Sequence, residues 1–244
     1  MSERIVVLGT GTCQLQTQRM ASSVLVELGD LRLVYDFGRG VTLRLVELGL
    51  RQDDLEHIVL SHFHPDHLDD LIPYLQAASW SQIDPRSKDL HIYGPIGLEV
   101  QLMRLLSLFG PDVLRRQHFR VHLHEVRGDE LVLGSHRFGY VDLPPADNRG
   151  LKLTHGGRTY AFTGDSDYHD QEVEFLRGVD LGVIDAGHPT DEQIVELAAR
   201  TQVPRLVCSH LYRELDEEEM NAKAREKGYS GRLIVGQDLM TFDL

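Results

Sequence analysis

Residues 60–70, with the sequence LSHFHPDHLDD, place three histidines and one aspartate within six positions. The cluster directly follows HIVL, a short apolar run that is typical of a buried strand. Beyond it, Leu68, Leu71 and Leu75 follow the i, i+3, i+7 spacing of an amphipathic helix, which is predicted over residues 67–79. The histidines are therefore expected on a strand-to-helix loop, where proteins often place reactive groups.

Imidazole and carboxylate groups together are typical ligands of Zn, Mn or Fe. In an extended loop, His62 and His64 point the same way and can share one metal ion. Asp66 and His67 lie beyond Pro65, where the loop turns into the helix, and can face a second ion. Two metal ions about 3.5–4 Å apart are a common device for hydrolysis. The alternative is that Asp66 merely caps the helix, which explains one of these four residues.

Composition narrows the possible partners and the cellular compartment. The 244-residue chain has 25 basic and 38 acidic residues, a formal net charge of −13, which disfavours nucleic acid as a partner. Two cysteines, Cys13 and Cys208, without a C-x-x-C motif favour a reducing compartment. Neither a signal-peptide pattern nor an apolar run of about 18 residues is found, so a cytoplasmic protein without a membrane partner is expected.

The order of the predicted elements favours stacked sheets flanked by helices. Strands dominate the beginning and the middle, with hairpins predicted around Gly29 and at residues 155–158. From residue 169 onward, helices and short apolar strands alternate. Because no internal repeat or linker interrupts the chain, a single domain spanning residues 1–244 is expected.

The motif SHFHPDHLDDL resembles the H-x-H-x-D-H signature of the metallo-β-lactamase superfamily. Four further segments resemble its ribonuclease Z-like and phosphodiesterase branch: VVLGTGT with RMASSVLVEL, YAFTGDSD, PRLVCSH and GQDLMTFDL. The resemblance implies an α/β fold, the four-layer αββα sandwich, with the site at one edge of the two sheets. It also implies two divalent metal ions, with Zn as the first choice and Mn or Fe as alternatives.

The resemblance implies roles for residues outside the first motif. Asp165, in YAFTGDSD, corresponds to the aspartate that bridges both metal ions, and His210, in PRLVCSH, corresponds to the last histidine ligand. Read alone, each would pass for a turn aspartate or an edge histidine. His188, in DAGHPTDEQ, resembles a histidine that assists catalysis, where it would stabilise phosphate charge or help the leaving group. Its alternative is an ordinary surface histidine before a helix.

One family ligand has no match in this sequence. The position of the third metal histidine, on the loop before the strand that leads to Asp165, falls at Pro144. Asp142 or Asp147 can substitute through a shifted loop, which would make the site richer in oxygen. Otherwise the first site holds its ion weakly, or stays empty, with His62 and His64 alone. In that last case only the second site is filled, by Asp66, His67, Asp165 and His210.

These features predict a metal-dependent hydrolase, with Asp66 orienting or deprotonating the attacking water. A small phosphodiester is the preferred substrate, because ribonuclease Z enzymes carry a long arm for which the 21 positions between Pro144 and Asp165 leave no room. The alternatives are a lactone or thioester hydrolase and a degenerate, non-catalytic metal-binding member. Related enzymes often form homodimers. Finally, His122 and His124 face one side of a strand, which favours a solvated strand face over a second metal site.

Overall fold

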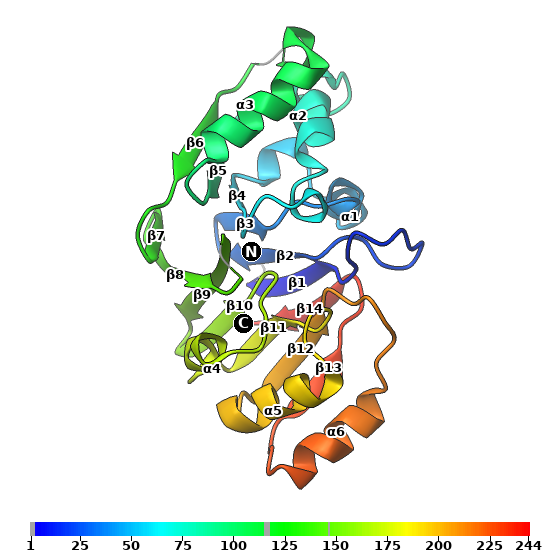
Figure 1. Cartoon of the computed structure of the whole chain (residues 1–244). Helices are drawn as coiled ribbons and strands as arrows, with labels where there is room; N and C mark the ends of the chain where they lie inside the picture. Colours follow the sequence, from blue (N-terminus) through cyan, green and yellow to red (C-terminus); the bar gives the residue numbers. More distant parts are fainter. Residues whose placement is uncertain (1–2, 115–117, 146) are drawn as a thin grey trace.

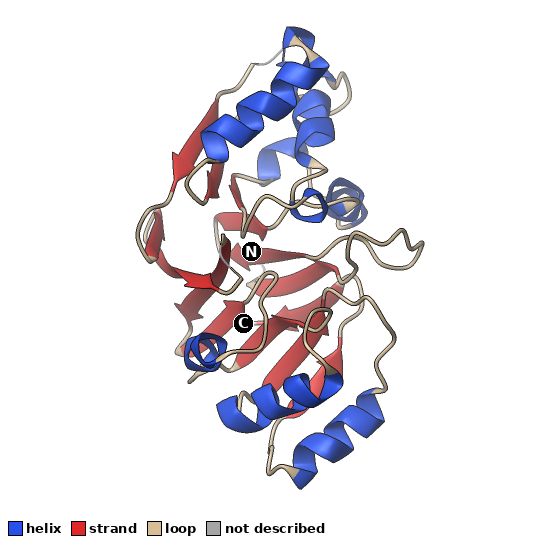
Figure 2. Cartoon of the chain, viewed as in Figure 1, coloured by secondary structure: helices blue, strands red, loops and turns tan. Residues whose placement is uncertain are grey.

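A computed structural model describes residues 3–114, 118–145 and 147–244 of the chain. Within these residues the strands form two seven-stranded sheets, ordered β14-β1-β2-β3-β4-β5-β6 and β13-β12-β11-β10-β9-β8-β7. Helices lie on the outer side of each sheet (Figures 1 and 2). The four layers are those of the expected αββα sandwich, so the predicted fold class is confirmed.

The first half of the chain builds one sheet, in which β1 to β3 are antiparallel and β3 to β6 are parallel. Its strands are β1 (Arg4–Gly9), β2 (Ser23–Leu28), β3 (Leu31–Tyr35), β4 (His57–Val59), β5 (Leu90–Gly94) and β6 (Val121–Glu125), with β14 (Met240–Asp243) added beside β1. The connections contain α1 (Val41–Glu47), α2 (Leu71–Trp80), α3 (Leu98–Phe109) and the 3-10 turns η1 (Gln52–Asp54), η2 (Pro65–His67) and η3 (Pro111–Leu114).

The second half builds the other sheet, an antiparallel meander from β7 to β10 that continues as parallel strands to β13. Its strands are β7 (Glu130–Leu133), β8 (His136–Leu143), β9 (Asn148–His155), β10 (Arg158–Phe162), β11 (Leu181–Asp185), β12 (Arg205–Ser209) and β13 (Arg232–Val235). Its helices are α4 (Asp170–Leu176), α5 (Asp191–Thr201) and α6 (Glu217–Glu226). The hairpin predicted at residues 155–158 joins β9 to β10.

Three apolar clusters hold the layers together. The central cluster lies between the sheets and combines residues of the first sheet, such as Val26 and Leu33, with residues of the second, such as Leu151 and Phe162. The two outer clusters pack helices against a sheet, α1 to α3 on one side and α4 to α6 on the other. Among the described residues, none of the helices has the length and apolarity needed to cross a membrane.

The helix predicted over residues 67–79 begins later than expected, at Leu71. The preceding residues form the 3-10 turn η2, and the backbone around it bonds to the end of β3: Phe37 N–H donates to the His67 carbonyl, and Asp70 N–H donates to the Phe37 carbonyl. The Asp70 carboxylate also accepts from the backbone N–H groups of Gly40 and Thr42. These contacts with distant residues replace the first turn of the predicted helix.

Helix α2 fixes the far end of the histidine loop through its buried face, so Leu75→Ala is expected to destabilise the protein. Leu75 is 0% exposed, and its truncation should lower the free energy of unfolding by about 2–5 kcal/mol, measured by urea denaturation. Leu43→Ala on α1 is the matched control, because Leu43 is 62% exposed and should change stability by less than about 0.5 kcal/mol. Equal effects of the two changes would contradict this packing.

Candidate metal centre

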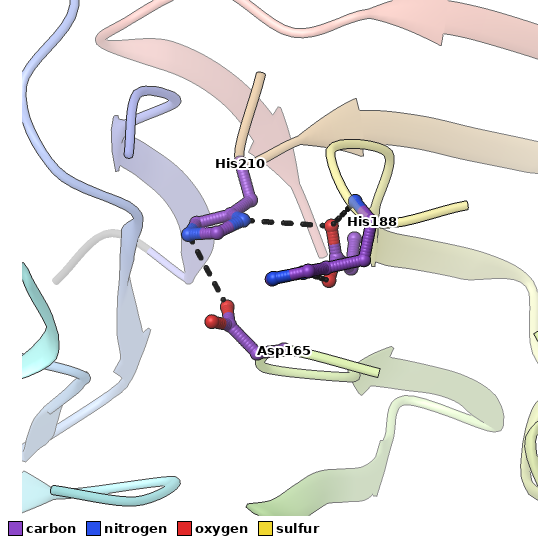
Figure 3. A group of neighbouring side chains, drawn as sticks. Asp165, His188 and His210 are labelled. Carbon is purple, nitrogen blue, oxygen red and sulfur yellow. Dashed lines mark hydrogen bonds and ion pairs between the residues drawn. The ribbon is translucent and has the colours of Figure 1, made fainter. Parts of the chain in front are cut away.

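The sequence-predicted site residues converge where strands of both sheets end. His62 and His67 follow β4 of the first sheet, whereas Asp165 follows β10 and His210 follows β12 of the second. Figure 3 shows the His210 ring between Asp165 and the loop that carries His188. Gly164 permits this approach, because it has a φ of 63° and an added Cβ would lie 2.4 Å from Asn148 Oδ1.

Asp165 lies at the centre of the group. Its Oδ1 is 3.0 Å from His67 Nε2 and 3.4 Å from His210 Nε2, and its Oδ2 is 3.7 Å from His62 Nε2. His62 Nε2, His67 Nε2 and Asp165 Oδ1 are nevertheless buried without a hydrogen-bond partner. Leaving such atoms unpaired costs about 1–3 kcal/mol each, and a cation between them would satisfy all three. The residues therefore fit a bound metal ion.

Ligand atoms within 4.8 Å of one another form three groups among the described residues, and two of these groups correspond to the two predicted sites. One contains His62, His64 and Asp165, and the other contains Asp66, His67 and His210. Since Asp165 also lies beside His67 and His210, its carboxylate is placed to serve both groups. The structure thus brings together all six residues predicted as metal ligands.

Asp36 determines which histidine nitrogens face the centre. Its carboxylate accepts from Ser61 N–H, from Ser61 Oγ–H and from His67 Nδ1–H, at 2.7 to 2.8 Å. Because the Ser61 hydroxyl proton is used in this way, Ser61 Oγ accepts from His62 Nδ1–H at 2.8 Å. With a cation bound, both rings would therefore carry their proton on Nδ1 and direct the Nε2 lone pair at the cation, which is the form that binds metal. Without a cation, burial opposes the charged form of His67, but the Asp165 and Asp36 carboxylates outweigh it and raise its pKa.

Asp185, at the end of β11, is a site residue that the sequence analysis missed. Its Oδ2 accepts from His188 Nδ1–H at 2.6 Å, and its Oδ1 accepts from Gly187 N–H at 2.7 Å and lies 3.5 Å from His210 Nδ1. It ends an apolar strand, LGVID, just as Asp165 follows one, and this shared position was the available signal. His188 also lies at the centre, in a group of possible ligand atoms with Asp165, Asp185 and His210, and its catalytic role stays a prediction.

The carboxylates set opposite pKa shifts within the cluster. Burial lowers the pKa of His62 to about 4, with a further contribution from the charge of His67. Burial also opposes the charged form of His210, but Asp185 and Asp66 outweigh it and raise its pKa to about 9. The pKa of Asp165 is lowered, since the neighbouring charged histidines outweigh the effect of its burial. The site is thus a concentrated negative charge that attracts cations or protons.

The loop without the third histidine lines a cavity of about 280 Å³ beside His62 and His64. Pro145 and Asp147 contribute to this cavity. Asp142 does not: its carboxylate lies 2.9 Å from Arg149 Nε, and its side chain is 83% exposed. Of the two substitutes considered for the missing ligand, only Asp147 is therefore placed near the candidate centre, and its ligation stays a prediction.

Comparison with known proteins agrees with this architecture. The model of a β-lactamase superfamily domain matches residues 36–211, which include the histidine motif, Asp165, Asp185 and His210. The chain belongs to the metallo-β-lactamase superfamily. Its relatives place it in the ribonuclease Z-like branch of this superfamily.

Three similar proteins illustrate the range of this superfamily. The ribonuclease Z of Mycobacterium sp. (strain KMS) is 30% identical over 176 residues, which cover 66% of the chain and 61% of the relative. The metallo-β-lactamase fold protein YhfI from Bacillus subtilis has a TM-score of 0.80 at 20% identity, covering 100% of both chains. A diphosphatase from the PhnP family has a TM-score of 0.71 at 20% identity, covering 99% of this chain and 97% of the other. The sequence analysis expected nucleic acid to be disfavoured as a partner. The ribonuclease among the relatives does not support that expectation.

Replacing Asp36 tests how the histidines are held. Asp36→Asn leaves one acceptor oxygen for three donors, so the His62 and His67 rings lose their fixed orientation. We expect Zn²⁺ affinity to fall about 10–100-fold, measured by competition with a chromogenic chelator. Asp30→Asn, in the exposed turn between β2 and β3, is the control. Unchanged affinity in Asp36→Asn would contradict the orienting role.

The raised pKa of His210 predicts a pH dependence of the metal-free protein. A group with a higher pKa in the folded than in the unfolded state stabilises the fold below its unfolded pKa, about 6.5, and loses this contribution as pH rises through the folded value. For His210 the folded value is about 9. Chelator-treated protein should therefore lose unfolding free energy across this window, and His210→Gln should lose less. The free energy of unfolding of both proteins is measured by urea denaturation at each pH. Identical pH profiles for wild type and His210→Gln would contradict the proposed contribution of His210.

Proposed function

We propose that this protein is a hydrolase of small phosphodiesters that uses two divalent cations, with Zn²⁺ as the first choice and Mn²⁺ or Fe²⁺ as alternatives. The observation that carries the proposal is the set of buried, unpartnered atoms of His62, His67 and Asp165, which face one another beside His188. The names of the similar proteins, a ribonuclease and a diphosphatase, support cleavage at phosphorus.

His62, His64 and Asp165 would hold one cation, and Asp66, His67, His210 and Asp165 would hold the other. When bound, such cations polarise the scissile ester and lower the pKa of water towards about 7. Asp66 would accept a proton from the attacking water. Its Oδ2 is 3.4 Å from His210 Nε2, and its pKa is lowered because hydrogen bonding to His210 outweighs its burial, so it is ionised at neutral pH.

His188 is suited to donate a proton to the leaving group. Its Nδ1–H is held by Asp185 at 2.6 Å, and it lines the same cavity as His62 and His64, so its other nitrogen is available on the cavity side. The hydrogen bond to Asp185 raises the pKa of His188, which keeps the ring protonated closer to neutral pH. A positioned acid of this kind contributes about 10²–10⁴ to the rate.

Two observations favour a small substrate, namely the size of the central cavity and the missing arm, and a third favours an anionic one. The cavity at the centre holds about 280 Å³, the size of a compact ligand. An adjoining cavity of about 500 Å³ shares Asp147 with it and offers Arg127 to a second anionic group. Between the loop and Asp165, the chain forms only the short β9–β10 hairpin, without the long arm of ribonuclease Z enzymes.

The test compares wild type and His188→Gln on two phosphodiesters, one with a nitrophenyl and one with an alkyl leaving group. An alkoxide needs protonation far more than a nitrophenolate, so kcat should fall by about 10²–10⁴ on the alkyl ester and much less on the nitrophenyl ester. His136→Gln is the control, since His136 lies at the start of β8, away from the cavity. Metal content, measured by elemental analysis, should not change between the three proteins.

Other outcomes identify the alternatives. Turnover of a lactone or thioester, without turnover of either phosphodiester, would replace the proposal with carbonyl hydrolysis. A wild-type protein that holds its cations and turns over none of these substrates would be a degenerate member, as the proline at position 144 allows. An equal fall on both phosphodiesters in His188→Gln would remove His188 as the acid and leave the hydrolase standing.

A further inference from the structure

A second group of histidines lies on three neighbouring strands of the first sheet, away from the candidate metal centre. In the register of β4, β5 and β6, His57 pairs with His91 and His91 pairs with His122. His124 lies two residues beyond His122 and therefore on the same face of the sheet. We call His57, His91, His122 and His124 the strand histidine cluster. The sequence analysis expected a solvated strand face at β6, because it did not place His57 and His91 beside it.

This cluster occupies the face that points towards the other sheet. Leu33, the register partner of His57 on β3, belongs to the core between the sheets. Tyr93, on the same face two residues after His91, belongs to that core as well. His57 is buried, whereas His91, His122 and His124 are half-buried. At the position of His57 an apolar side chain would bury surface without losing hydration, so its imidazole calls for a reason.

Two of the rings are already close enough to bind the same metal ion. His91 Nδ1 lies 3.0 Å from His124 Nε2, near the separation of about 3.3 Å that two nitrogens have on one tetrahedral Zn²⁺. Their ring centroids are 5.3 Å apart, and those of His57 and His91 are 5.5 Å apart. The His67 and His210 rings of the candidate metal centre, which face the same Asp165 oxygen, are 5.4 Å apart.

Hydrogen bonds explain the positions of three of these histidines but not that of His57. A shared proton accounts for His91 and His124, and Asp89 accounts for His122 at 2.8 Å. His57 is only 9% exposed, and its Nδ1 is buried without a partner. Burial lowers the pKa of His57 to about 4 and lowers those of His91 and His124, so these rings are neutral at pH 7, as a metal ligand must be.

We propose that the strand histidine cluster is a second metal site, which binds one late first-row divalent cation through His91 Nδ1, His124 Nε2 and His57. Among the described residues, no third ligand atom of the cluster lies within 4.8 Å of both His91 Nδ1 and His124 Nε2. A three-histidine site therefore requires the His57 side chain to turn towards the other two rings, and water would fill the remaining position. This proposal is independent of the proposed function.

The ligand chemistry of this site differs from that of the candidate metal centre. An all-imidazole set favours Ni²⁺, Cu²⁺ or Zn²⁺ and gives little affinity for Mg²⁺ or Ca²⁺, which prefer oxygen. The candidate centre, in contrast, contains Asp66 and Asp165. Ni²⁺ is therefore a suitable probe, and Mg²⁺, which should not bind to the cluster, is the negative control.

The experiment is Ni²⁺ titration by calorimetry on the full chain, with the candidate centre disabled by His62→Gln, His64→Gln, Asp165→Asn and His210→Gln. We expect about one Ni²⁺ per chain to remain bound. Adding His91→Gln and His124→Gln should abolish this binding, and adding His57→Gln alone should raise Kd more than about tenfold. Adding His118→Gln instead, at an exposed histidine outside the cluster, should change nothing.

Equal Ni²⁺ binding with and without His91 and His124 would overturn the proposal, as would the absence of Ni²⁺ binding in the disabled protein. Circular dichroism verifies that each variant is folded. If the combined variant does not fold, the single change His124→Gln on the edge strand is made in wild type. There the proposal requires the loss of about one Ni²⁺ equivalent, and retention of every equivalent would overturn it.

Discussion

The carboxylate of Asp36 is the interaction on which the candidate centre depends. It lies at the end of β3, with a left-handed φ of 62°, and it binds the loop that follows β4 through Ser61 and His67. The neighbouring backbone reinforces this contact, because Asp36 N–H donates to the Val59 carbonyl and Phe37 N–H donates to the His67 carbonyl. One buried carboxylate thus helps to fix the path of the histidine loop, and it holds the Nδ1 side of the His67 ring directly and that of the His62 ring through Ser61.

Both sheets contribute to the centre, but with different chemistry. The first sheet contributes the histidine loop, which is local in sequence, whereas the second contributes Asp165, Asp185 and His210 from the ends of three successive strands. Parallel pairing of β10, β11 and β12 aligns these ends, so residues up to 45 positions apart meet at one edge. The apolar core between the sheets then brings this edge against the histidine loop.

Local patterns predicted much of this arrangement, because they depend on neighbours in the chain. The histidine motif, the β9–β10 hairpin and the strand ends before Asp165 and His210 are of this kind. The misses came from non-local contacts. The start of α2 depends on bonds to Phe37, and the strand histidine cluster depends on the register of parallel strands, which sequence spacing does not reveal. Asp185 carried a local signal, but a single aspartate after a strand is usually a turn residue.

The position of Asp165 has a mechanical consequence. Its carboxylate comes from one sheet and lies 3.0 Å from a histidine that is anchored to the other, so the centre spans the seam between the two halves of the sandwich. A small slip of one half against the other would separate the proposed ligands before it exposed much of the core. Alignment of the halves and retention of a cation are therefore two aspects of one equilibrium, and each would stabilise the other.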